Sequence, residues 1–276
     1  MISFLLWPFV VSLILTGIHT YLGIHVIRRG VIFVDLALAQ MAALGATLAV
    51  LFGHDLHDPA AYWASLGMTF IGAAFFSLSR SRKERVPQEA IIGITYAVSA
   101  AAAIIVLDRA PGGAEHIRAL LVGDILTVTP AQVMKTALLY SAVGLFHWIL
   151  RQPFLLVSFH PEEAIHKGYR LRLWDFLFYM TFGIVVTSSV SLAGVLLVFA
   201  YLIVPAVISI LFAETIAQRL WIGWGLGIAA SLLGIAASVT FDLPTGASIV
   251  CAFGLLLALS VGTRGAYGRF LNEDDR

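Results

Sequence analysis

The chain has 276 residues, of which 60% are hydrophobic and only 12% are charged. A water-soluble protein of this length needs a larger charged surface, so the composition excludes an ordinary soluble globule and predicts an integral membrane protein. The formal net charge of +1 gives no reason to expect nucleic acid as a partner, and the single cysteine, Cys251, excludes an intrachain disulfide and a multi-cysteine metal cluster.

Nine apolar runs of about the length that crosses a bilayer follow one another along the chain. Each is predicted to be a helix, because lipid offers no partner to an unpaired backbone group and the sequence lacks barrel-like alternation. The first run is interpreted as a retained span rather than a signal peptide. The expected spans are 4–27, 31–52, 60–78, 90–107, 131–150, 173–190, 192–213, 220–241 and 247–261.

Residues 111–130 differ from these runs. The segment is rich in glycine and contains Glu115, His116, Arg118 and Asp124. We predict a short surface helix or a re-entrant element here. With that exception the pattern is uniform, and residues 1–276 are predicted to form a single polytopic transmembrane domain.

Basic residues gather in alternate connections between the expected spans. If the first span ends on the inner side, the inner segments hold all of the 17 Lys and Arg residues except Arg109, Arg118 and Lys135. Because inner loops of membrane proteins carry the excess of positive charge, we predict an outer N-terminus, an inner C-terminus and an odd number of spans.

A few polar side chains within the spans are candidates for a substrate path, since such groups are costly in lipid unless paired or wetted. Asp35 opens the second span and Gln40 follows within one to two turns; the first span carries His19 and His25. Asp, His and Gln offer the oxygen and nitrogen ligands that suit manganese, iron or zinc. An equally open interpretation is that Asp35 is a helix-start acid stabilised by the helix dipole, and that both histidines are hydrogen-bonded inside the bundle.

Several short motifs occur in a characteristic order. Arg28-Arg29-Gly30 precedes Asp35, and three further motifs fall at 85–93, 122–126 and 194–206, the last of which ends Pro205-Ala206. Asp-Leu-Pro-Thr-Gly then spans Asp242, Pro244 and Gly246. Over nearly its whole length the chain therefore resembles the permease subunits of bacterial zinc, manganese and iron ABC uptake transporters.

The resemblance implies a role for the segment at about 158–170, which the charge pattern places inside. His160-Pro-Glu-Glu-Ala-Ile-His-Lys-Gly168 is similar to the cytoplasmic coupling helix that docks into the ATPase in this family. Ala164 and Gly168 would present a small-residue face, and Glu162 and Glu163 would suit the helix start. An ordinary amphipathic inner loop is the alternative.

The second span departs from the family pattern. Many members carry Asp-Ala-Leu-Ser-His, whose Asp and His resemble a metal-coordinating pair, whereas this chain has Asp35-Leu-Ala-Leu-Ala39-Gln40. The aspartate can be carried over and the histidine cannot. Gln40 is the candidate replacement, as a weaker and neutral oxygen ligand.

The resemblance implies a type II importer architecture in the bacterial plasma membrane, with two copies of the chain around the path. An ATP-binding subunit inside and a periplasmic or extracellular metal-binding protein outside are the expected partners. A divalent metal ion would be substrate, with no permanently bound cofactor and no catalysis in this chain. The alternatives are a secondary transporter driven by protons or sodium, and a membrane-embedded enzyme, which needs a catalytic set that the sequence lacks.

Overall fold

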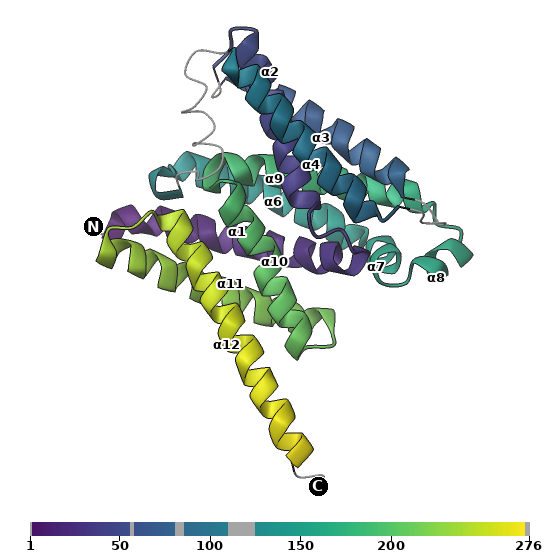
Figure 1. Ribbon diagram of the computed structural model, residues 1–276, viewed down its shortest axis with the longest axis vertical. Helices are drawn as coiled ribbons and strands as arrows, with labels where there is room; N and C mark the ends of the chain where they lie inside the picture. The colour runs from purple at the N-terminus through teal and green to yellow at the C-terminus, as the bar shows by residue number, and fades with distance from the viewer. Residues whose placement is uncertain (1, 56–57, 81–85, 110–124, 274–276) are drawn as a thin grey trace.

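The computed structural model describes residues 2–55, 58–80, 86–109 and 125–273, and in these ranges every regular element is a helix. The predicted all-α class is confirmed (Figure 1). In chain order the elements are α1 (Ile2–Arg29), α2 (Val34–Leu51), α3 (Pro59–Ser79), α4 (Gln88–Asp108), the 3-10 turn η1 (Ile125–Thr127), α6 (Pro130–Ile149), α7 (Arg151–Phe159), α8 (Pro161–His166), α9 (Leu171–Ala193), α10 (Val195–Phe212), α11 (Ile216–Phe241) and α12 (Thr245–Glu273).

The number of helices that can cross a membrane agrees with the prediction. Among the described residues, eight helices are long and apolar enough, and the number is nine if the bent pair of α6 and α7 is counted as one span. The expected fifth span, 131–150, corresponds to α6. Past Leu150 the chain continues as a second helix at an angle of 77°, which the sequence analysis did not predict.

Two helices begin with the same polar motif. The hydroxyl of Thr129 accepts from the backbone N–H of Gln132 at 3.3 Å, and the Gln132 side chain accepts from the N–H of Thr129 at 2.8 Å. Thr215 and Gln218 make the same reciprocal pair at the start of α11. Each capping box satisfies two backbone donors that a helix start would otherwise leave unpaired. Of the predicted 111–130 element, residues 111–124 lie outside the described part of the chain.

The spans form two groups (Figure 1). Helices α2, α3 and α4 pack together, and α1 packs with α6, α10 and α11, while α12 packs on α10 and α11. Helix α9 contacts both groups, through α2 and α3 on one side and α6 and α10 on the other. The N-terminus and the short helix α8 lie at opposite sides of the molecule, as the predicted topology requires.

Backbone-to-backbone contact holds some of these helices together. A Cβ atom added to Gly23 of α1 would lie 2.0 Å from the carbonyl oxygen of Leu202 in α10, and one added to Gly45 of α2 would lie 2.4 Å from that of Ala64 in α3. Small residues permit this approach in membranes, where apolar burial alone does not draw helices together. Both close approaches therefore require glycine, because any side chain at these positions would collide with the neighbouring helix.

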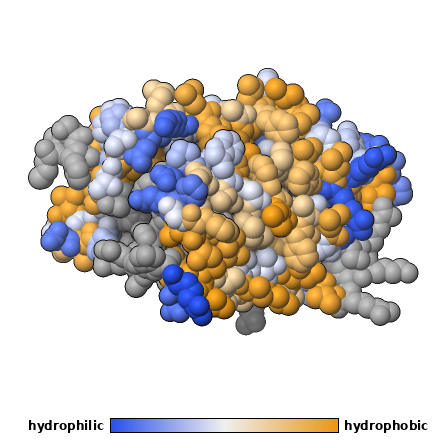
Figure 2. All heavy atoms as spheres, turned by 90° about the horizontal axis from the view of Figure 1, so that it is seen from above, coloured by the Kyte–Doolittle hydropathy of each residue, from blue (hydrophilic) through white to orange (hydrophobic). Residues whose placement is uncertain are grey.

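The outer surface matches a lipid solvent. Helices α1, α2 and α9 are the most buried spans, whereas α4 and α12 are the most exposed. Large apolar side chains such as Ile105 and Trp221 lie on the outside. Figure 2 shows hydrophobic side chains as a broad band across the middle of one face, with hydrophilic side chains gathered toward its two ends. This distribution is expected of a multi-pass membrane protein.

Candidate functional site

Asp35 is buried near the start of α2 without a partner. It is 1% exposed, and neither carboxylate oxygen has a hydrogen-bond partner among the described residues. The nearby start of α2 is capped instead by Glu89, whose carboxylate accepts from the backbone N–H of Phe33 at 2.9 Å. A buried carboxylate without a donor is costly, so Asp35 needs a cation, a proton or water to complete its surroundings.

Gln40 is half-buried on the same helix. Five residues correspond to a rotation of about 140° around a helix with 3.6 residues per turn, so Gln40 and Asp35 point to different sides of α2. The pair does not converge on one ion within a single chain.

His19 and His25 are fully engaged in packing α1 against its neighbours. The ring nitrogens of His19 lie 2.8 Å from the Leu15 carbonyl oxygen and 3.1 Å from the Ser189 hydroxyl. Nδ1 of His25 lies 2.8 Å from the Ser158 hydroxyl of α7. Both histidines thus have the hydrogen-bonded bundle role that the sequence left open.

The candidate ligands do not assemble into one metal centre. In the described ranges, no three His, Cys, Asp or Glu side chains come close enough to hold a metal ion together. Of the buried candidates, His19 and His25 have hydrogen-bond partners, whereas the carboxylate of Asp35 has none among the described residues.

A buried charge cluster that the sequence analysis missed lies among α1, α3 and α9. Asp175 is completely buried and forms ion pairs with Arg29 and Arg80; Nη1 of Arg80 donates to its two oxygens at 2.8 and 2.7 Å. Nε of Arg29 donates to the Ser158 hydroxyl at 2.9 Å, and its guanidinium lies 4.1 Å from the ring centre of Phe178. The signal was present in the sequence, because Asp175 is the single acid in the apolar run 173–190.

The predicted coupling segment folds as a short helix, α8, followed by a tight turn. Tyr169 N–H donates to the Ala164 carbonyl oxygen and Gly168 N–H to that of Ile165, both at 2.9 Å, and Gly168 has φ +81°. These two bonds and the left-handed glycine form a Schellman motif, which ends a helix. Lys167 lies 2.7 Å from Glu163, and this hydrogen bond and charge hold the pKa of Glu163 below its usual value.

The small-residue face expected on this segment is not present. Ala164 is 0% exposed because it faces the body of the protein, and Gly168 lies beyond the end of α8. The exposed residues of α8 are Glu162, Glu163 and His166. The reason for the difference is that the chain turns back at Gly168 to begin α9, so the two small residues do not share a helix face.

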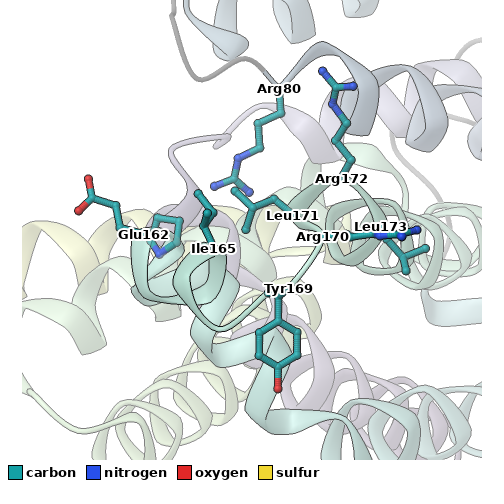
Figure 3. A pocket seen from close by; sticks show the side chains of 10 residues that line it. Arg80, Glu162, Ile165, Tyr169, Arg170, Leu171, Arg172 and Leu173 are labelled. Atoms are coloured by element: carbon teal, nitrogen blue, oxygen red, sulfur yellow. The ribbon is translucent and has the colours of Figure 1, made fainter.

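Figure 3 shows a cleft beside α8, lined by side chains from the end of α3, from α8 and from the start of α9. Its volume is about 1160 Å³. Arg80 reaches into it from α3, so one side chain joins this cleft to the buried Asp175.

The family-motif residues have structural positions. Pro205 is buried within α10. Asp242 ends α11 in a left-handed conformation with φ 53°, Pro244 accepts from the N–H of Ser248 at 3.0 Å, and Gly246 lies in the first turn of α12. The Asp-Leu-Pro-Thr-Gly motif is thus the tight turn between two spans.

Comparison with known proteins gives consistent matches along the chain. Residues 1–263 match the ABC 3 transport family. A probable iron transport system membrane protein of Haemophilus influenzae is 24% identical over 87% of this chain and 86% of its own length. The manganese transport system membrane protein MntC of Halalkalibacterium halodurans is 25% identical over 87% and 80%.

A solved structure has the same fold. PsaBC from Streptococcus pneumoniae, determined in complex with a Fab, matches 93% of this chain and 90% of its own chain with a TM-score of 0.77 and 22% sequence identity. At this identity the likeness establishes the arrangement of the helices.

Proposed function

Because the chain belongs to the ABC 3 transport family, we propose that it is the membrane permease of an ATP-driven importer of divalent metal ions. Relatives over most of its length are named for manganese and for iron transport. These two metals, with zinc, are the cations that we expect the chain to carry.

The observation that supports a cation path most directly is the unpartnered carboxylate of Asp35. In a span, a buried charge without a donor marks a functional group more often than a structural one. A passing divalent cation would supply the missing charge. Since the described residues of one chain do not gather three ligands, we infer that two copies face each other and contribute an Asp35 each, as a homodimer around the path.

We assign the energy source to partners. An ATP-binding subunit would contact the inner face at α8 and its surroundings, and a metal-binding protein would deliver the cation at the outer face. The sequence has no phosphate-cradling loop, so hydrolysis belongs to the ATP-binding subunit.

A secondary transporter driven by protons or sodium fits less well. Such a protein needs a carboxylate that exchanges its ion freely during transport. Asp175 does not suit this role, because Arg29 and Arg80 hold it from two sides. Asp35 would suit either kind of transporter, so it is the family match that favours the ATP-driven importer.

The test is metal uptake in cells that express the chain with its ATP-binding subunit and its metal-binding protein, measured separately for manganese, iron and zinc. We expect accumulation of at least one metal that stops when the ATP-binding subunit is replaced by a variant unable to hydrolyse ATP. Uptake that continues unchanged with this variant would contradict the proposal and favour the secondary transporter.

A further inference from the structure

The cleft beside α8 is strongly basic. Among its lining residues, Arg80, Arg170 and Arg172 face a single acid, Glu162. Arg170 and Arg172 are exposed, and neither has an ion-pair partner in the described part of the chain. In Figure 3 the carboxylate of Glu162 points away from the three arginines. Among the described lining residues, the positive charge of the cleft is thus not balanced.

The buried side of the same cleft also carries an excess of positive charge. Asp175 is one carboxylate shared between Arg29 and Arg80, and Nη2 of Arg29 is buried with no partner among the described residues. Because Asp175 is shared in this way, it cannot neutralise the arginines that open into the cleft.

A second cleft, lined by residues that flank α8, also carries more basic than acidic side chains. It has a volume of about 610 Å³ and contains Arg28, Lys167 and Arg219 with the acid Glu214, and Lys167 is in addition paired with Glu163. The excess of positive charge near α8 is therefore larger in the first cleft.

The backbone adds to this preference. Helix α9 begins in the first cleft, and Arg170 at its N-cap position makes no side-chain cap. The N-terminus of α9, a helix of 23 residues, carries the positive end of the helix dipole and so favours an anion in the first cleft. The three guanidinium groups of the cleft favour an anion as well.

We propose that the cleft formed by Arg80, Arg170 and Arg172 is the docking site for an acidic surface segment of the ATP-binding subunit. This inference rests on the proposed function and adds the charge of the partner surface and the residues that recognise it. Guanidinium groups bind carboxylates through paired hydrogen bonds, which gives such a contact direction as well as strength. The apolar Ile165, Leu171 and Leu173 between the arginines suit a protein surface better than a lipid headgroup.

The test compares binding of the purified cognate ATP-binding subunit to the full-length chain and to the double variant Arg170→Gln/Arg172→Gln, at low and at high salt. Two exposed ion pairs correspond to a change of about fivefold to tenfold in affinity, so we expect the variant to bind that much more weakly at low salt. High salt should remove most of the difference, because it screens exposed charges.

A control is Arg151→Gln, which removes one charge from the inner side where the double variant removes two. Arg151 stacks on Trp148 at the start of α7 and does not line the cleft. We expect this variant to bind the ATP-binding subunit like the unchanged chain. The charge reversal Arg172→Glu should weaken binding of the unchanged ATP-binding subunit. Changing an acidic residue on the subunit's docking surface to lysine should restore binding to this variant.

The outcomes distinguish a failure of the proposed docking site from a failure of the proposed function. If the unchanged chain binds the ATP-binding subunit and the double variant binds it equally well, the docking site is wrong while the proposed function stands. If the double variant instead loses only its binding to phosphatidylglycerol-containing vesicles, the cleft is a lipid site and the inference is also overturned. If the unchanged chain does not bind the subunit, the proposed function itself fails.

Discussion

Asp35 and Asp175 are both buried carboxylates in apolar helices, and their surroundings are opposite. Asp175 is held by two arginines, whereas Asp35 has no partner among the described residues. The first arrangement satisfies a charge within the fold, and the second leaves it available to a ligand. The two residues should therefore respond differently to the same substitution by asparagine.

For Asp35→Asn we expect metal uptake to fall by about tenfold or more, because a neutral amide removes the charge that would hold a divalent cation. Folding and binding of the ATP-binding subunit should persist, since no contact within the described chain is lost. Uptake by the variant complex in proteoliposomes is the measurement. Transport at the original rate would contradict a role in metal transport and would leave Asp35 as an acid at the start of α2.

For Asp175→Asn we expect a loss of stability of about 3–5 kcal/mol, because two arginines would remain without their counter-charge in a largely buried site. The midpoint of thermal unfolding in detergent should fall accordingly. The matched change Glu162→Gln removes an exposed carboxylate and should leave the midpoint nearly unchanged. Equal midpoints for Asp175→Asn and the original chain would contradict this account.

Residue chemistry was only partly readable from the sequence. Asp35 was identified because it opens a span and lies within a recognisable motif. The Asp175 cluster was not, because Arg80 and Arg29 lie 95 and 146 residues away from Asp175 in the chain, and a pattern of local spacing cannot bring them together. The hydrogen bonds of His19 and His25 likewise depend on Ser189 and Ser158, which lie 170 and 133 residues away.

At the scale of elements, the turn after α8 depends on one backbone conformation. For Gly168→Ala we expect a loss of about 1–2 kcal/mol, because a side chain at φ +81° meets the steric cost of the left-handed region. Open space surrounds this position, so crowding does not contribute. The midpoint of thermal unfolding and the affinity for the ATP-binding subunit should both fall, since the turn sets the direction of α8 beside the cleft.

The control for this change is Gly254→Ala. Gly254 lies in α12, is also surrounded by open space, and has no positive φ. Alanine there should be neutral or slightly stabilising, because glycine is the poorer helix former. Equal effects at the two glycines would show that the turn after α8 does not depend on its left-handed residue.

At the scale of the whole molecule, the topology is the property most open to a direct test. A label placed between residues 80 and 85, or a reporter fused after Arg276, should be accessible from the cytoplasm alone. A label between residues 55 and 58 should be reached from outside in intact cells. Labelling of the 80–85 segment from outside would reverse the orientation and contradict the distribution of basic residues.

The number of spans was predictable and the path of the chain was less so. Apolar length defines each span because lipid allows few alternatives to a helix. The end of the fifth span near Leu150 was predicted, but the 77° bend into α7 was not, because Arg151 and Gln152 indicate where the span ends and not the direction in which the chain continues. The small-residue face of Ala164 and Gly168 was wrong because sequence spacing does not reveal where a short helix ends.

The contact of Gly23 with Leu202 limits how the molecule can move. Because backbone atoms face each other there with no room for a Cβ, α1 and α10 cannot slide past one another by one helical turn without placing a side chain such as His19 or Ile27 against that carbonyl. Gly45 and Ala64 tie α2 to α3 in the same way.

Each tied pair must therefore travel as a rigid body, and any opening of the path must occur between the pairs. Spin labels on α1 and α10 should keep one separation through the ATP cycle, while labels on α3 and α10 should report two. A changing separation between α1 and α10 would show that this backbone contact opens during transport.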